Sequence, residues 1–196
     1  MNFENWRHYA RAWLLHFIGQ QDRAYEAFAL AFRHDAQDHQ AARHLAAIAA
    51  ERKQYDVAEK WFLEVLRITP ADADTHFNLG FVREQAGKPR LAIDAFREAA
   101  RLKPILDRAW YGQGLAHAAL GEHAEAAAAL KEAARLQPMN GIAWYQLGMA
   151  YHRNGQADQV EKVLRKLIEF EPKMSRQLVR DSGREDLAKL LPELPF

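Results

Sequence analysis

Small and bulky apolar residues recur along the chain with a period of 34 residues. A small residue stands at Ala12, Ala46, Gly80, Gly114 and Gly148. An alanine row follows at Ala24, Ala58, Ala92 and Ala126, with Val160 completing it, and a bulky apolar row at Phe28, Phe62, Phe96, Leu130 and Leu164. Small side chains let two helices cross closely, and a bulky neighbour fills the space beside the crossing. The pattern therefore predicts five helix pairs, in repeats 5–38, 39–72, 73–106, 107–140 and 141–174.

Residues that end or begin helices follow the same period. Glycine is expected to end the first helix of a pair, where a left-handed backbone is needed, at Gly19, Gly87, Gly121 and Gly155, and Lys53 takes that place in the second repeat. Proline is expected to end the second helix at Pro70, Pro104, Pro138 and Pro172. The expected N-caps of the following helices are Asp38, Asp72, Asp107, Asn140 and Ser175.

With these columns in register, the chain resembles a tetratricopeptide repeat (TPR) protein. The segments 143–151 (Ala-Trp-Tyr-Gln-Leu-Gly-Met-Ala-Tyr) and 76–80 (His-Phe-Asn-Leu-Gly) resemble the first-helix motif of that family. The resemblance covers residues 5–174 and implies an all-α fold, a right-handed α-solenoid of five tandem TPR helix pairs. The first repeat departs most from the family, because Arg11 stands at the usual leucine position and Ala36 where proline is expected.

Residues 175–196 follow the last repeat and are expected to form a C-terminal capping helix and tail. The end of a solenoid exposes an apolar face that needs a cover. Five apolar residues are available for this: Leu178, Val179, Leu187, Leu190 and Leu191. The alternative is that the tail 191–196 docks in a groove of its own chain or of a neighbour.

The family resemblance also implies where a partner binds. The first helices of TPR proteins line a concave groove, with positions 2, 5, 9 and 12 of each repeat facing it. Position 5 holds Tyr9, Arg43, Phe77, Tyr111 and Tyr145, and position 9 holds Trp13, Ala47, Phe81, Leu115 and Met149. Position 9 is usually polar in the family, so five apolar residues there predict an exposed apolar strip, the kind of surface that binds partners. The expected function is a protein–protein interaction scaffold that binds an extended peptide or helix of another protein.

A more specific hypothesis is that the groove binds the C-terminal carboxylate of a partner. Some family members hold the C-terminal carboxylate of a partner with basic and asparagine side chains from three successive repeats. On repeats two to four of this chain, Arg43, Asn78 and Arg108 match that arrangement, whereas Ala47 and Gly112 do not. The two arginines have a simpler alternative role, in ion pairs with Asp74 and Glu84.

Two other functions fit a chain of this kind. A secretion-type chaperone would shield apolar segments of an export substrate, as some TPR proteins of this size do. A self-assembling structural protein would use Trp6, Trp13 and Phe17, or the tail 192–196, to bridge copies. A further alternative is that capping helices or self-association cover the exposed strip.

The composition limits the classes of partner and the cellular compartment that we expect. Lysine and arginine total 27 against 26 acidic residues, so no overall charge favours nucleic acid or an anionic membrane. The apolar stretch 13–18 is far shorter than the roughly 20 residues that span a bilayer, and charged residues interrupt the region where a signal peptide would have its apolar core. The chain contains no cysteine, which fits a reducing compartment. We expect a cytoplasmic protein, and the alanine- and arginine-rich composition suggests a bacterial source.

No pattern of catalytic or metal-binding residues emerges. The nine histidines include no i, i+4 pair on a helix, and His76 replaces a tryptophan that is usual at its position, which favours a partly buried structural role. Gly112 and Gly114 lie inside a predicted helix rather than after a strand, so they do not form a phosphate loop. We therefore expect a protein that is not an enzyme and that holds no metal and no cofactor.

Overall fold

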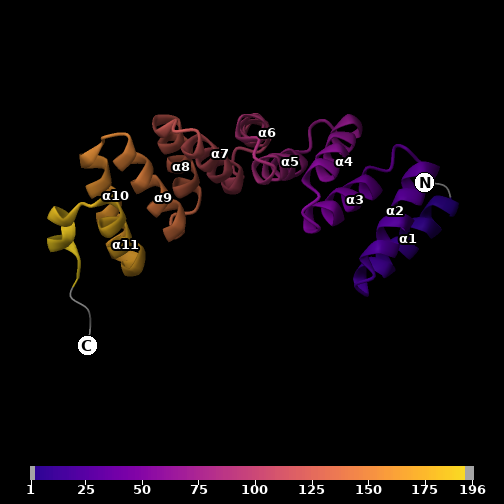
Figure 1. The fold of residues 1–196 in the computed structure, drawn as a ribbon, viewed down its shortest axis with the longest axis horizontal. Helices are drawn as coiled ribbons and strands as arrows, with labels where there is room; N and C mark the ends of the chain where they lie inside the picture. The colour runs from indigo at the N-terminus through magenta and orange to yellow at the C-terminus, as the bar shows by residue number, and fades with distance from the viewer. Residues whose placement is uncertain (1–2, 193–196) are drawn as a thin grey trace. The chain divides into compact units, whose positions relative to one another are not determined.

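The structure, a computed structural model, describes residues 3–192 (Figure 1). These residues form eleven α-helices and one 3-10 helix, with no strand among them. The predicted all-α solenoid of tandem helix pairs with a C-terminal capping helix is confirmed. Residues 1–2, and residues 193–196 of the tail, lie outside the described part.

The helices group into two compact units that meet in sequence between Leu102 and Lys103, and each is described by itself. The first unit contains α1 (Phe3–Phe17), α2 (Gln21–His34), α3 (His39–Glu51), α4 (Tyr55–Ile68), α5 (Ala73–Gln85) and α6 (Pro89–Leu102). The second contains α7 (Asp107–Ala119), α8 (His123–Leu136), α9 (Gly141–Arg153), α10 (Ala157–Phe170), α11 (Pro172–Ser182) and the 3-10 helix η1 (Glu185–Leu190). The odd-numbered helices α1 to α9 are thus the first helices of the five pairs.

The turns within the pairs have the backbone that the glycine column predicts. The four glycines adopt positive φ, for example 78° at Gly19 and 77° at Gly121. In the second repeat the same left-handed turn is made by Lys53, with φ of 58°, the only positive-φ residue other than glycine in the described part. A left-handed backbone is strained in a residue that has a Cβ atom, so Lys53 keeps the turn geometry at some cost in stability.

The N-cap predictions are right at three positions and wrong at two. The side chains of Asp38, Asp72 and Asn140 accept hydrogen bonds from backbone N–H groups in the first turns of α3, α5 and α9. The N-cap of α7 is Leu106, and Asp107 is the first residue of the helix. Ser175 lies inside α11, buried, where its hydroxyl donates to the carbonyl oxygen of Pro172 at 2.7 Å.

The small residues at the eighth position of each repeat lie at close helix crossings. A Cβ built on Gly80 would meet the ring of Phe96 at 2.6 Å, and one on Gly114 would meet the side chain of Leu130 at 2.5 Å. Both Phe96 and Leu130 are fully buried. The predicted pairing of a small residue with the bulky residue of the second helix therefore describes the core of the third and fourth pairs, whereas in the fifth pair Gly148 lies against Leu178 and Val163.

The alanine column allows a direct test of this packing. Ala92 is completely buried in α6, so replacing it with leucine should overpack the crossing and lower the free energy of unfolding by about 1–3 kcal/mol. Urea unfolding measures the loss. Ala128 is an exposed alanine in the middle of α8, and Ala128→Leu is the matched control that should leave the midpoint nearly unchanged. Equal midpoints for the two variants would contradict the packing.

The C-terminal cap begins earlier than predicted, because α11 starts at Pro172 and the expected boundary after residue 174 lies inside it. Leu178 is fully buried in one apolar cluster with Leu147, Leu164 and Leu167, and a Cβ on Gly148 would meet Leu178 at 2.7 Å. Val179 and Leu187 complete the buried part, and Leu190 and Leu191 pack at its edge. The five apolar residues picked out for capping therefore all contact the core of the second unit.

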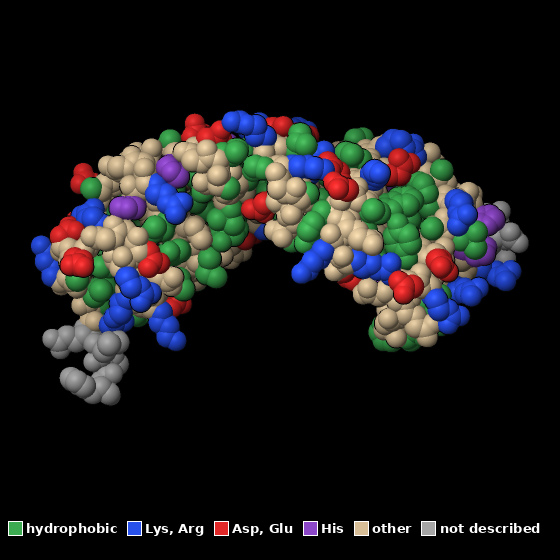
Figure 2. All heavy atoms as spheres, in the orientation of Figure 1, with side chains coloured by type: hydrophobic (Ala, Val, Ile, Leu, Met, Phe, Trp, Pro, Cys, Tyr) green, Lys and Arg blue, Asp and Glu red, His purple; other side chains and the backbone are tan. Residues whose placement is uncertain are grey.

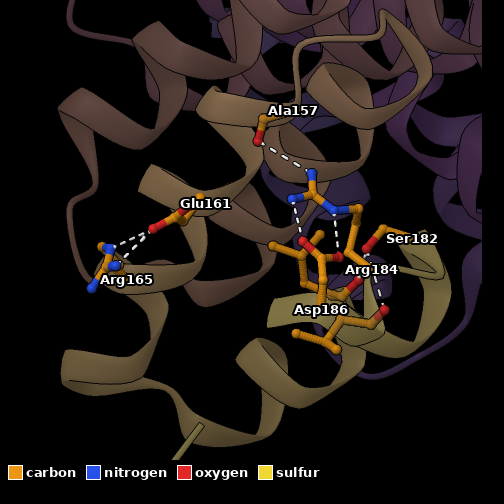
Figure 3. Close-up of polar contacts among 8 residues, drawn as sticks. Ala157, Glu161, Arg165, Ser182, Arg184 and Asp186 are labelled. Carbon is orange, nitrogen blue, oxygen red and sulfur yellow. Dashed lines mark hydrogen bonds and ion pairs between the residues drawn. The ribbon is translucent and has the colours of Figure 1, made fainter. Parts of the chain in front are cut away.

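Polar contacts hold the turn from α11 into η1 (Figure 3). The hydroxyl of Ser182 donates to the carbonyl oxygen of Leu178 at 2.6 Å, and Gly183 ends α11 with φ of 64°. Next to it, Arg184 forms a two-pronged ion pair with Asp186, with N–O distances of 2.8 Å, and also donates to the carbonyl oxygen of Ala157 in α10 (Figure 3). These contacts fix the cap against α10.

Candidate protein-binding face

The residues expected to bind a partner lie on the first helices of both units. In the first unit Tyr9 and Trp13 lie on α1, Arg43 on α3, and Phe77, Asn78 and Phe81 on α5. In the second unit Arg108, Tyr111 and Leu115 lie on α7, and Tyr145 and Met149 on α9. Figure 2 shows hydrophobic side chains gathered over α2 and α3 in the first unit and over α8 and α9 in the second. We call the predicted residues the inner face of their unit.

On α5, the inner face presents an exposed aromatic ring beside a half-buried one. Phe81 is 45% exposed, although its neighbours Gly80 and Val82 are buried. Phe77, one turn earlier, is half-buried and lies 5.8 Å from Phe96, measured between ring centroids. Phe77 is therefore partly a core residue, whereas most of the ring surface that α5 offers to a partner comes from Phe81.

Arg43 is engaged within the chain. Its guanidinium pairs with the carboxylate of Asp72, the N-cap of α5. Burial opposes ionisation of Asp72, but hydrogen bonds from Thr75 and the nearby Arg43 outweigh it and hold the pKa of Asp72 below its ordinary value. A partner carboxylate would have to compete with Asp72 for this arginine, which weakens the carboxylate-binding interpretation. Arg108 is exposed and lies in the other unit.

Tyr9 also has a structural role. Its hydroxyl and Nε2 of His44 are hydrogen-bonded at 3.1 Å, and its ring meets Phe28 edge-on. The His44 ring in turn stacks on Phe28, with 4.4 Å between centroids. This cluster joins α1, α2 and α3, and the sequence pattern had singled out only Tyr9 from it as a binding residue.

The cluster predicts acid sensitivity. Burial, with His16 and Arg43 nearby, lowers the pKa of His44 from its ordinary value of 6.5, and the opposing effect of Asp38 is smaller. The unfolded chain therefore takes up a proton near pH 6.5 while the folded chain does not, so stability should fall as the pH drops below that value. His44→Gln should flatten part of this fall, measured as urea midpoints at pH 7.5, 6.5 and 5.5. Parallel pH profiles for wild type and variant would show that His44 does not carry the effect.

In the second unit the inner face contains a hollow that the sequence did not indicate. It has a volume of about 200 Å³ and is lined by Ala118, His123, Tyr145, Gln146, Met149, Ala150 and Arg153. Tyr145 and Met149 belong to the predicted face, whereas His123, at the start of α8, and Arg153, at the end of α9, were not predicted. Nδ1 of His123 is buried without a hydrogen-bond partner, and the lining of the hollow mixes polar and apolar side chains.

Tyr145 is oriented by the cap. Its hydroxyl donates to Oδ2 of Asp181 on α11 at 2.7 Å. Burial and the hydrogen bond to Asp181 raise the pKa of Tyr145, so its hydroxyl stays protonated and donating. Tyr111, Tyr145 and Met149 are half-buried against the core, as is Leu115 on α7. An exposed apolar strip is thus most evident at Trp13 and Phe81, and the remaining large residues of the inner face show only part of their surface.

His76 has the structural role expected from its position. Its Nε2 donates to the carbonyl oxygen of Pro70 at 2.9 Å. Tryptophans at the same place in the next two repeats make the same contact, Trp110 with Pro104 at 3.0 Å and Trp144 with Pro138 at 2.9 Å. The ring N–H of His76 therefore replaces the indole N–H, and the ring closes the turn between repeats.

The described part of the chain contains neither a cluster of metal ligands nor a membrane-spanning helix. No group of three or more histidine, aspartate or glutamate side chains in 3–192 is arranged to hold a metal ion. Over the same range, every helix is too short or too polar to cross a membrane.

Family models match most of the chain. A model of the tetratricopeptide repeat matches residues 9–73 and 77–138, and a second model with the same description matches residues 117–178. No curated protein sequence matches the chain.

Solved structures show the same fold at low sequence identity. A crystal structure of the MamA protein is 20% identical, with a TM-score of 0.80 and full coverage of both chains. A fragment of MamA from Desulfovibrio magneticus RS-1 is 20% identical over 87% of this chain and 97% of its own, with a TM-score of 0.79. YrrB, described as a TPR protein with an unusual peptide-binding site, is 21% identical over 90% of each chain, with a TM-score of 0.77. The matched family models, which cover most of the sequence, and the tandem helix pairs together show that this chain belongs to the tetratricopeptide repeat family.

Proposed function

We propose that this protein is an interaction scaffold, not an enzyme, that holds a peptide or helical segment of another protein against its inner face. The observation that carries the proposal is Phe81, a phenylalanine 45% exposed in the middle of a helix whose neighbouring residues are buried. Exposed aromatic rings in such settings are typical anchors of protein interfaces. The crystal structure of YrrB supports the proposal, because that TPR protein has a peptide-binding site.

The binding energy comes from apolar burial with a few polar contacts that set the register of the partner. In the first unit Phe81 and the exposed part of Phe77 supply the apolar surface, with Asn78 beside them. In the second unit the hollow beside Met149 provides polar contacts to the partner, from Arg153 and Gln146 in its lining. Leu115 and Tyr111 on α7 extend this apolar surface in the second unit.

The test compares two equally exposed apolar residues. Phe81 on α5 is 45% exposed and Leu91 on α6 is 46% exposed. Phe81→Glu should weaken binding at least tenfold, because it places a charge where an apolar anchor is buried on binding. Leu91→Glu, on a second helix, should leave binding unchanged. Partners captured from a lysate of the source organism on each immobilised variant are compared by mass spectrometry, and affinities are then measured with the purified ligand.

Circular dichroism and urea unfolding show whether both variants remain folded. Equal capture by wild type and Phe81→Glu would place the binding surface elsewhere. Loss of capture with Leu91→Glu alone would assign it to the second helices. Unfolding of Phe81→Glu would show that Phe81 is a core residue and remove the argument for the inner face.

A further inference from the structure

Helix α1 exposes apolar residues beyond Trp13, the one that it shares with the inner face. One side of the helix is buried, with Ala12 at 0% and Leu15 at 8% exposure. The other side exposes five large apolar residues: Trp6 at 56%, Trp13 at 50%, Leu14 at 55%, Phe17 at 74% and, just after the helix, Ile18 at 54%. We call these five residues the α1 strip. In Figure 2 hydrophobic side chains cover the tip of the first unit, where α1 ends and the chain turns into α2.

Helical spacing makes the strip continuous. Trp6, Trp13 and Phe17 are separated by seven and four residues, so they project from one side of the helix, with Leu14 and Ile18 next to them. The rings of Trp13 and Phe17 are stacked, with 5.6 Å between centroids and 9° between planes. This pair is a preformed flat aromatic surface that loses little side-chain freedom on binding.

The opposite end of the chain shows how such a face is normally covered. There α11 and η1 bury Leu178, Val179 and Leu187 against α9 and α10. Terminal helices of solenoids usually carry a polar outer surface that keeps the protein soluble. In the described residues, α1 packs on α2 and α3 and presents the apolar strip on its outer side.

The area of the strip fits a modest symmetric dimer. Since a buried aromatic side chain contributes about 150–250 Å², these partly exposed residues present on the order of 500 Å² of apolar surface per copy. Two copies would then bury about 1,000 Å², the smallest area expected of a specific interface. A surface that pairs with itself needs only a two-fold axis, the commonest symmetry of oligomers.

We propose that the α1 strip is a homotypic interface, through which two copies of this chain associate reversibly, α1 against α1. The proposal shares Trp13 with the inner face, but it does not depend on the partner that the inner face binds. Helix α1 carries two exposed arginines beside the strip, Arg7 and Arg11, against one acidic residue in its sequence, Glu4, so the charged residues of the helix sum to a positive charge. Two such helices repel each other electrostatically while their apolar surfaces attract, so the dimer is weak and tightens when salt screens the arginines.

The effect of salt on binding distinguishes a second copy of the chain from two other occupants of the strip, an acidic helix and an anionic lipid surface. An acidic helix or an anionic lipid surface would be attracted by Arg7 and Arg11, and its binding would weaken as salt is added. A second copy shows the opposite trend. The sign of the salt effect therefore identifies what covers the strip.

Sedimentation velocity of the full chain, from roughly 1 to 200 μM, tests the proposal in the concentration range of a weak interface. Wild type should pass from monomer to dimer, and raising sodium chloride should lower the dissociation constant. Phe17→Glu should raise that constant at least tenfold. Ile105→Glu is the matched control, because Ile105 is 73% exposed and lies in the second unit, and it should dimerise like wild type.

Four results would overturn the proposal. They are a monomeric wild type at every concentration, dimerisation that Phe17→Glu leaves unchanged, equal losses for Phe17→Glu and Ile105→Glu, and association that weakens with salt. A monomeric wild type that binds phosphatidylglycerol vesicles through Phe17 would assign the strip to a membrane surface instead. Circular dichroism establishes that Phe17→Glu is folded, and Leu14→Glu provides a second variant of the strip if it is not.

Discussion

Replacing Leu178 by aspartate should lower the free energy of unfolding of the second unit by on the order of 5 kcal/mol, because it leaves an unpaired charge in a dry core. Leu178 is completely buried on α11, and it lies directly over Gly148 in α9. The cluster around it includes Leu164 and Leu167 of α10, so the charge would face apolar side chains from two helices. The expected result is a second unit that is largely unfolded at room temperature.

The measurement is amide hydrogen exchange resolved by helix, together with urea unfolding. Exchange in α9, α10 and α11 should rise together, because one cluster holds them. Ile142→Asp is the control, since Ile142 is 55% exposed in the same unit. Normal protection of α9 and α10 in Leu178→Asp would mean that the cap is an appendage and not part of the core.

The second large effect concerns the crossing of α5 and α6. Phe96→Ala should cost about 3–5 kcal/mol, since Phe96 is 1% exposed and its loss leaves a cavity. Gly80→Ala alone should also destabilise the chain, although alanine is the better helix former, because the added Cβ would lie 2.6 Å from the Phe96 ring. In the Phe96→Ala background that obstacle is gone, and Gly80→Ala should stabilise the protein by about 1 kcal/mol.

A double-mutant cycle from urea unfolding of the four proteins measures this change of sign. A coupling energy of at least about 1 kcal/mol is expected for residues in such close contact. If the two substitutions add independently, Gly80 and Phe96 do not meet as the structure has them. This outcome would also remove the physical reason for the small-residue column.

The helix pairs could be predicted from the sequence because their cause is local and repeated. A small residue at Gly114 and a bulky one at Leu130 are needed wherever two helices cross closely, so the same spacing recurs in every pair. At α7 the residue type and the period of the repeat disagree, because the acidic Asp107 stands one position after the periodic N-cap position. The N-cap follows the proline by two residues at Asp72 and Asn140, and the same spacing places Leu106 at the N-cap of α7.

The beginning of the cap departs from the repeat for a different reason. Glu171 is both the C-cap of α10 and the N-cap of α11, so Pro172 starts a helix instead of preceding a longer turn. Proline is favourable at the first position of a helix, where its missing N–H needs no partner. The presence of a proline in the sequence does not show whether it ends one helix or begins the next.

The details of the inner face were beyond sequence reasoning because they depend on side chains about one repeat apart. The hydrogen bond from Tyr145 to Asp181 and the contact between Tyr9 and His44 join residues 36 and 35 positions apart. Helical periodicity says which side of a helix a residue occupies, but it does not say which neighbour its side chain reaches. The sequence therefore predicts the inner-face residues as a set, and only the structure separates the exposed Phe81 from the engaged Tyr9 and Arg43.

The central claim is that a partner lies against the first helices, and site-specific photo-crosslinking in cells tests it most directly. A photoreactive phenylalanine analogue such as p-benzoylphenylalanine is placed at Phe81 in one protein and at Leu91 in another, two positions of nearly equal exposure. The account predicts a crosslinked partner polypeptide from Phe81 and none from Leu91. Crosslinking from Leu91 but not from Phe81 would contradict it and place the partner on the second helices.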